Sequence, residues 1–185
     1  MRKYQPQRFE NILPISFEID REYLLDVANK LKTKDFFYKG EHIPNYRYAH
    51  YTDASLKYFL NHSIGFPDMG LKYRSSFVFL QKGTTLPWHT DKNNKCAFIW
   101  VLNEDRSCVE FRDPPADLTT LRPVQTSRKY VYKDAIIDTQ KEHRVKIEQD
   151  RILFKVSILN HSFGETCSRY GQKFGITWSD YYAKY

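Results

Sequence analysis

The sequence predicts a mainly β fold, a sandwich or jelly roll, preceded by supporting helices. Six short segments rich in Val, Ile, Phe and Tyr follow one another after residue 73, and Gly, Pro, Asn or Asp separates them. No helical pattern stands between these segments, which argues against alternating βαβ units. The first seventy residues instead place apolar side chains at helical spacing.

Two helices are expected before the strands. Asp20 can cap a helix over residues 20–31, and Thr52 or Asp53 can cap a second helix that ends before Gly65 and Pro67. Between them, residues 38–52 form a turn-rich, aromatic connection. The apolar positions of the two helices are Tyr23, Leu24, Val27, Leu31, Leu56, Phe59 and Leu60.

The strand segments are short and evenly distributed up to residue 159. A stretch with three prolines, residues 112–129, interrupts them and is expected to be a long loop. The predicted strands cover residues 75–80, 96–102, 107–111, 130–139, 143–147 and 152–159.

The length of 185 residues indicates a single domain, 1–185. Within it we expect helical N-terminal support in residues 1–72, a jelly-roll catalytic core in residues 73–160 and a C-terminal extension in residues 161–185.

Composition indicates a globular protein without a membrane span. Apolar residues make up 41% and charged residues 28%, and no apolar run is long enough to cross a bilayer. Three widely spaced cysteines suggest neither a disulfide framework nor a Cys-rich zinc site, so we expect a reduced, cytoplasmic setting. The net charge of +7 favours an anionic partner, although it also fits a protein that is simply basic.

The segment His89-Thr90-Asp91 carries the first chemical signal. Side chains two apart on an extended segment point to the same side, so His89 and Asp91 could reach one ion. His143 follows 54 positions after His89, at the start of another strand. Two imidazoles and one carboxylate on one face of a metal leave three positions open, as non-haem Fe(II) oxygenases require. By itself, each residue would equally fit a solvated turn.

This order of motifs resembles the Fe(II)- and 2-oxoglutarate-dependent dioxygenases, whose signature is His-x-Asp/Glu, a distal His and a basic residue on a late strand. The resemblance implies a double-stranded β-helix (a cupin-like jelly roll). It also implies Fe(II) held by His89, Asp91 and His143, 2-oxoglutarate as co-substrate and O2 as oxidant. Asp91 argues against halogenation, because halogenating members typically lack the carboxylate ligand. Hydroxylation, or demethylation through a hydroxymethyl product, is the implied reaction.

The resemblance further implies that a basic residue on the last strand pairs with the distal carboxylate of 2-oxoglutarate. Alternation puts Arg151, Lys155 and Ser157 on one face of that strand. Lys155, twelve residues after His143, is favoured, with Ser157 adding a hydroxyl contact. Arg151, eight residues after His143, is the alternative anchor.

Two other functions fit the same residues. The first is a cupin-like zinc or manganese isomerase or hydrolase that uses the same three ligands. The second is a non-catalytic nucleic-acid-binding domain, suggested by the charge and the aromatic content of 16%. The substrate is unidentified, with a protein or amino-acid side chain favoured over a nucleic acid, and basic residues in 112–129 fit an anionic substrate. Trp88 and the tyrosines Tyr46, Tyr48, Tyr51 and Tyr73 are secondary candidates for substrate or co-substrate contacts, whereas His42, His50, His62 and His161 are expected to have no site role.

Overall fold

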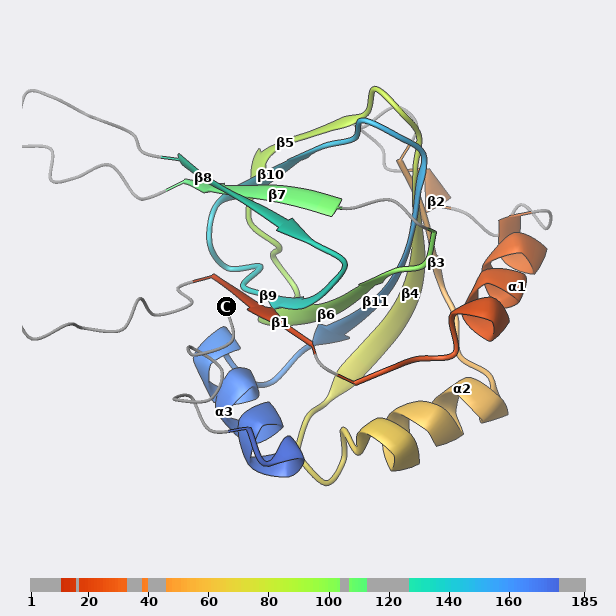
Figure 1. The fold of residues 1–185 in the computed structure, drawn as a ribbon, viewed down its shortest axis with the longest axis vertical. Coiled ribbons are helices and arrows are strands. Elements are labelled where there is room, and N and C mark those ends of the chain that lie inside the picture. Colours follow the sequence, from red (N-terminus) through yellow and green to blue (C-terminus); the bar gives the residue numbers. More distant parts are fainter. Residues whose placement is uncertain are drawn as a thin grey trace, which may run out of the picture.

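Two antiparallel sheets face each other in a jelly roll, as the sequence predicts (Figure 1). The computed structural model describes residues 11–15, 17–32, 38–39, 46–103, 107–112 and 127–176. No helix in these ranges is long and apolar enough to cross a bilayer.

The larger sheet has seven strands in the order β1-β9-β6-β11-β4-β3-β2. Its centre is β11, which pairs with β6 on one side and with β4 on the other. The strands are β1 (Ile12–Pro14), β2 (Tyr38–Lys39), β3 (Tyr46–His50), β4 (Tyr73–Leu80), β6 (Cys96–Val101), β9 (Asp134–Ile137) and β11 (Arg151–Ile158).

The smaller sheet has four strands in the order β5-β10-β7-β8 and covers the inner face of the larger one (Figure 1). Its strands are β5 (Thr85–His89), β7 (Ser107–Arg112), β8 (Ser127–Tyr132) and β10 (His143–Lys146).

Strand β6 shows why the sequence contains such a continuous apolar run. Phe98 and Trp100 pack outward into one hydrophobic core, and Ala97, Ile99 and Val101 pack inward into another. A strand buried on both faces loses the usual alternation of apolar and polar residues. The inner core lies between the two sheets, and the outer core lies between the larger sheet and the helices.

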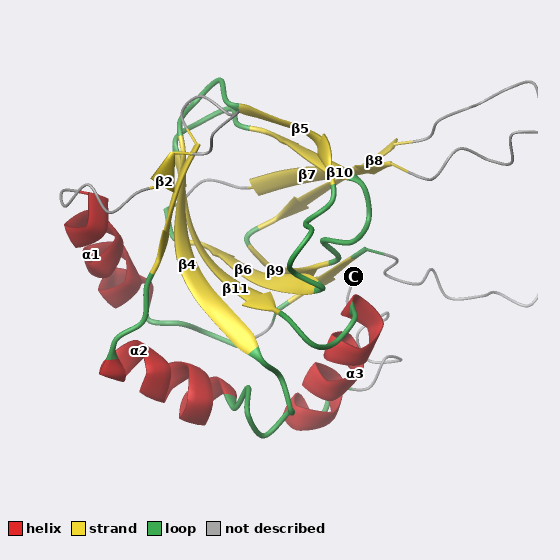
Figure 2. Ribbon diagram, turned by 180° about the vertical axis from the view of Figure 1, so that it is seen from behind, coloured by secondary structure: helices red, strands yellow, loops and turns green. Residues whose placement is uncertain are grey.

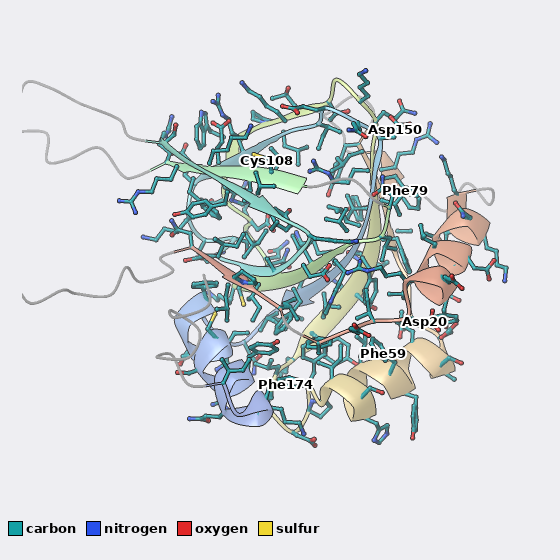
Figure 3. The ribbon with its side chains drawn as sticks, in the orientation of Figure 1. Asp20, Phe59, Phe79, Cys108, Asp150 and Phe174 are labelled. Atoms are coloured by element: carbon teal, nitrogen blue, oxygen red, sulfur yellow. The ribbon has the colours of Figure 1, made fainter. Side chains whose placement is uncertain are left out.

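Three helical segments cover the outer face of the larger sheet (Figure 2). Asp20 accepts a hydrogen bond from the Tyr23 backbone N–H at 2.9 Å, which confirms the expected cap at the position labelled in Figure 3. Asp53 caps the second helix by accepting from the Leu56 N–H at 2.7 Å. The segments are α1 (Arg21–Lys32), α2 (Ala54–Tyr58) continued by the π-helix η1 (Phe59–Ile64), and α3 (Phe163–Phe174).

The structure corrects two local expectations and adds a C-terminal helix. Residues 46–50 are strand β3 and not part of a turn-rich connection, so the N-terminal region adds strands to the sheet as well as helices. The expected strand 130–139 is divided at Lys133, with β8 in the smaller sheet and β9 in the larger. Residues 163–174 form a helix that begins with a capping box between Ser162 and Glu165. The expected loop 112–129 lies largely outside the described residues, which end at 112 and resume at 127.

Candidate metal centre and its cavity

Two strands of the smaller sheet bring the two histidines together. Strands β5 and β10 pair antiparallel with His143 directly opposite His89, and the ring centroids lie 4.3 Å apart. Phe111 of β7 flanks His143 on its other side, with a centroid distance of 5.9 Å. The pairing therefore joins two imidazoles that are 54 residues apart in the chain.

A bulge in β5 turns His89 toward the interior. His143 pairs with His89 and Val145 pairs with Leu86, so Pro87 and Trp88 together oppose the single residue Arg144. Without the extra residue, alternation from Leu86 would direct Trp88 inward and His89 outward. A bulge re-aims the side chains that follow it, and proline fits there because it has no N–H to give to the ladder.

The Asp91 side chain lies beside the two histidines, although Asp91 belongs to a loop beyond the end of β5. The expectation that His89 and Asp91 converge by simple strand alternation is therefore wrong in its cause. The backbone N–H of Asp91 donates to the Thr139 carbonyl at 2.8 Å, and the Gln140 side-chain amide donates to the Asp91 carbonyl at 2.7 Å. These bonds tie the loop to the segment between β9 and β10.

The carboxylate of Asp91 divides its two oxygens between different neighbours. Oδ2 accepts from Lys155 Nζ at 2.9 Å and from Asn94 at 3.2 Å, and Oδ1 lies 3.7 Å from His89 Nε2. Burial by itself would raise the pKa of Asp91, but the charge and hydrogen bond of Lys155 lower it to about 2. Asp91 in turn raises the pKa of Lys155 despite the burial of that amine. The two groups form an ion pair inside the protein.

Both imidazoles are fixed in the same tautomer. Nδ1 of His89 lies 2.7 Å from the Pro87 carbonyl, and Nδ1 of His143 lies 2.8 Å from the Lys141 carbonyl. A carbonyl oxygen only accepts, so each Nδ1 donates and each Nε2 can keep its lone pair for a metal. Burial lowers the pKa of His143 to about 4, which keeps that ring neutral at physiological pH.

The donor atoms of His89, Asp91 and His143 all lie within 4.8 Å of one another. Ligands about 2.1 Å from one ion and at near right angles are about 3 Å apart, so small side-chain movements would close the set. Two neutral imidazoles and one carboxylate suit a divalent transition-metal ion such as Fe(II), Zn(II) or Mn(II). The residues present therefore fit a single divalent metal.

A cavity of about 240 Å³ opens beside these donors, between the two sheets. Its walls are mostly apolar, with two cations, Arg151 and Lys155, on the β11 side. Arg151 is only 2% exposed. The lining residues are Tyr46, Val78, Leu80, Leu86, His89, Asp91, Ile99, Val109, Tyr132, Ile137, Thr139, His143, Val145, Arg151, Leu153 and Lys155.

The other expected site residues divide into those at the cavity and those away from it. Ser157 is buried farther along β11, beside Ala97 of β6, and is not part of the cavity wall as the structure describes it. Of the four candidate tyrosines, Tyr46 lines the cavity, and burial raises its pKa. His42 lies outside the described residues.

Trp88 occupies the outer face of the smaller sheet instead of the cavity. The guanidinium carbons of Arg112 and Arg144 lie 5.1 and 4.7 Å from the centroid of its ring. Each arginine also pairs with a glutamate, Arg112 with Glu142 at 2.5 Å and Arg144 with Glu110 at 2.6 Å. This stack of Trp88 with two arginines links β5, β10 and β7 on the side opposite the histidines.

Sequence reasoning did not select Tyr132 and Thr139 as cavity residues. Tyr132 ends β8 at the point where the chain passes between the sheets, and Thr139 follows β9 and accepts the Asp91 N–H through its carbonyl. Tyr132 lies at the break within the expected strand 130–139 and Thr139 lies at its end, so recognition of that break is the signal that could have found Tyr132.

By sequence, no family model and no curated protein matches the chain. By structure, it is similar to a prolyl-4-hydroxylase from Pseudomonas putida, with a TM-score of 0.54 and 10% identity, over 82% of this chain and 93% of that one. It is also similar to a prolyl hydroxylase from Trichoplax adhaerens in complex with a hypoxia inducible factor peptide fragment. There the TM-score is 0.57 and the identity 10%, over 85% of each chain.

A third similar structure is an oxidoreductase of the 2OG-Fe(II) oxygenase family from Burkholderia pseudomallei. Its TM-score is 0.52 and its identity 12%, over 82% of this chain and 84% of that one. Identities this low show a shared architecture and leave the chemistry to be argued from the residues. The chain therefore has the double-stranded β-helix fold of the Fe(II)/2-oxoglutarate oxygenases, as the resemblance in its sequence motifs implied.

Proposed function

We propose that the protein is a non-haem Fe(II) oxygenase that couples oxidative decarboxylation of 2-oxoglutarate to hydroxylation of a protein or amino-acid side chain. The observation that carries the proposal is the convergence of His89, Asp91 and His143 within 4.8 Å at the wall of a mostly apolar cavity. Fe(II) held by these three residues would supply O2 activation at its three remaining positions.

The protein's own residues prepare that centre in three ways. The carbonyls of Pro87 and Lys141 orient the two imidazoles. Lys155 holds the second oxygen of Asp91, which favours binding through Oδ1 alone. The apolar walls exclude water, which strengthens ion pairs within the cavity and limits side reactions.

The contacts favour Arg151 over Lys155 as the anchor of 2-oxoglutarate. Lys155 already contacts Asp91 and so lies beside the proposed iron, whereas the distal carboxylate is at the far end of a five-carbon chain whose other end would chelate the metal. Arg151 lies four residues, about 13 Å of strand, farther along β11. Its guanidinium can hold a carboxylate with two hydrogen bonds.

Tyr46 supports this assignment through the sheet register. Leu80 of β4 pairs with Tyr46 of β3 on one side and with Arg151 of β11 on the other. The side chains of three residues aligned across neighbouring strands project from the same face. Tyr46 and Arg151 both line the cavity, so the phenol can add a hydrogen bond to a carboxylate held by Arg151.

Anaerobic titration with Fe(II) and 2-oxoglutarate tests the proposal, through the visible metal-to-ligand charge-transfer band of the chelate. We expect the band with wild-type protein and its loss in His89→Ala, Asp91→Ala and His143→Ala. Succinate release and O2 consumption in the presence of substrate complete the test, because a hydrolytic zinc or manganese enzyme shows neither. Absence of both band and succinate in wild-type protein would refute the proposal.

The anchor is tested separately by the affinity for 2-oxoglutarate. We expect Arg151→Ala to weaken 2-oxoglutarate binding at least tenfold with Fe(II) binding retained, and Arg47→Ala, on β3 next to Tyr46, to change it less than twofold. If Lys155→Ala gives the larger loss while Fe(II) affinity stays unchanged, Lys155 is the anchor.

The substrate class that we propose rests on one structural neighbour. The Trichoplax adhaerens structure contains a peptide, and a protein or peptide substrate is the class that this neighbour supports. Mass spectrometry of peptide libraries incubated with the loaded enzyme would reveal gain of one oxygen atom on a side chain. Loss of a methyl group as formaldehyde would instead indicate demethylation.

A further inference from the structure

A second hollow lies outside the β-helix, between the beginning of β4 and the helical segment formed by α2 and η1. We call it the β4–α2 groove. Strand β3 pairs with β4 only from Ser76 onward, and the chain then leaves the sheet to enter α2 (Figure 2). The groove has a volume of about 780 Å³ and is lined by His50, Tyr51, Thr52, Lys57, Asn61, Leu71, Lys72, Tyr73, Arg74 and Ser75.

Basic side chains gather in the groove without acidic partners. Lys57, Lys72 and Arg74 are exposed, and none of the three forms a side-chain ion pair with a carboxylate in the described part of the chain. Other cations are matched, since Arg21, Arg112 and Lys173 each have an acidic partner. The wall residues themselves include no Asp or Glu.

Electrostatic repulsion is already visible at the groove wall. The pKa of His50 is lowered, first by burial and then by the positive charge of Arg74. Cations that repel one another and have no internal counterion create a local positive potential, which attracts an anion.

The polar groups of the two tyrosines are already occupied within the protein. Tyr73 donates to Asn61 Oδ1 at 2.6 Å, and Tyr51 donates to Asp53 at 2.9 Å. The two tyrosines would therefore contact a ligand through their rings. The combination of ring surface and unpaired cations is characteristic of sites that stack a base and neutralise a phosphate.

The helical wall of the groove has an unusual geometry. Residues Phe59–Ile64 form a π-helix, which ends at Gly65 with a positive φ of 77°. Asn61 projects from this segment into the groove wall. π-Helical turns are rare and occur frequently at functional sites, which is a second observation that points to a ligand here.

We propose that the β4–α2 groove binds a phosphate-bearing nucleotide, either free or within a single-stranded nucleic acid. Lys57, Lys72 and Arg74 contact phosphate, and the rings of Tyr51 and Tyr73 contact a base. The groove shares no lining residue with the metal cavity, so the proposal does not depend on the oxygenase chemistry.

Fluorescence anisotropy with a labelled single-stranded 12-nucleotide RNA tests the site, with unlabelled ADP and inorganic polyphosphate as competitors. The variant Lys72→Gln/Arg74→Gln removes two cations from the groove. The control Lys82→Gln/Lys146→Gln removes two exposed cations elsewhere and so makes the same change in net charge. Exposed substitutions of this kind leave folding nearly unchanged, which circular dichroism verifies.

We expect the groove variant to bind the RNA at least tenfold more weakly than wild type, and the control to stay within twofold. The slope of log affinity against log salt should fall in magnitude by about 1.4 in the groove variant, since about 0.7 is lost for each phosphate contact to a single strand. Protection of Lys72 from acetylation by bound RNA should accompany binding.

The other possible results of the anisotropy experiment either overturn the site or identify its ligand. Absence of RNA and ADP binding by wild type, or equal losses in the two variants, overturns the site. ADP competing as strongly as RNA identifies a free nucleotide as the ligand, and weaker competition identifies the strand. Polyphosphate competing as strongly as RNA of the same charge overturns the role of the tyrosine rings.

Discussion

The ammonium of Lys155 holds the carboxylate oxygen of Asp91 that is turned away from His89. Both side chains are largely removed from solvent, with exposures of 19% and 16%. A buried ion pair contributes little net stability, but the loss of one partner leaves an uncompensated charge. At this position the lysine therefore neutralises the Asp91 carboxylate.

We expect Lys155→Met to lower the free energy of unfolding of the metal-free protein by about 3 kcal/mol, because Asp91 then remains buried with Asn94 as its side-chain partner. The double variant Asp91→Asn/Lys155→Met should recover most of this loss. Urea unfolding followed by circular dichroism measures it. Lys82→Met, at an exposed position, is the control, and a Lys155→Met protein as stable as this control would contradict the prediction.

The bulge in β5 determines which face of the smaller sheet His89 occupies. Pro87 and Trp88 share one position opposite Arg144, and contacts with Arg112 and Arg144 hold Trp88 on the outer face. The metal donors and the tryptophan stack are thus on opposite faces of the same two strands. Disturbance of the stack should loosen the orientation of the histidines.

Trp88→Leu should weaken binding of Co(II), used as a spectroscopic probe, by about tenfold, because supporting contacts around ligands are commonly worth that much. Trp88→Phe keeps an aromatic face for the two arginines and should lose much less. The visible absorption of Co(II) measures the affinity. The prediction fails if folded Trp88→Leu protein binds Co(II) as tightly as wild type.

The N-cap of α2, Asp53, contributes stability that depends on pH. The Leu56 N–H bond lowers the pKa of Asp53, together with the hydroxyls of Tyr51 and Tyr23, so the folded state binds the proton less readily than the unfolded state. The stability that the Asp53 carboxylate contributes is therefore complete above the unfolded-state pKa of about 3.9. It is lost as the pH falls below that value toward the lower folded-state pKa.

We expect Asp53→Ala to cost about 1 kcal/mol at pH 7 and markedly less near pH 3. Urea unfolding at both values measures the difference. Asp53→Asn, which keeps an acceptor oxygen without the titrating charge, should lose less at pH 7 and should show a weaker pH dependence than wild type. An equal cost of Asp53→Ala at both pH values would contradict this account.

At the scale of the whole molecule, local sequence patterns predicted the β-rich architecture. They did not predict which strands pair or where distant residues meet. Cap residues such as Asp20 and Asp53 act within one turn, so the two N-terminal helices could be read directly. Strand β3 was missed because its aromatic residues sit between turn-forming ones. The division at Lys133 was missed because residues on both sides favour strands.

The same limit applies to the candidate site. The identities and order of His89, Asp91 and His143 could be recognised from their spacing, but the reason for their convergence could not. That reason is a bulge opposite Arg144 and a loop hydrogen bond to Thr139, which depend on pairing partners far away in the chain. The contact between Lys155 and Asp91, 64 residues apart, was hidden for the same reason.

Metal binding should stabilise the entire fold. A ligand that binds only the native state at 100 times its dissociation constant adds about 2.7 kcal/mol. For a chain of this length, that amount raises the melting temperature by about 5–10 °C. Differential scanning fluorimetry with Mn(II) measures the shift in wild type, and His143→Ala should show none. An equal shift in both proteins would place the ion elsewhere.

The register that sets His89 opposite His143 also has a consequence during synthesis. A ribosome-bound chain from which β10 has not yet emerged presents only His89 and Asp91, two of the three candidate ligands. If the proposed function holds, the complete ligand set forms only when β10 pairs with β5, so tight metal binding would begin after the β-helix has closed.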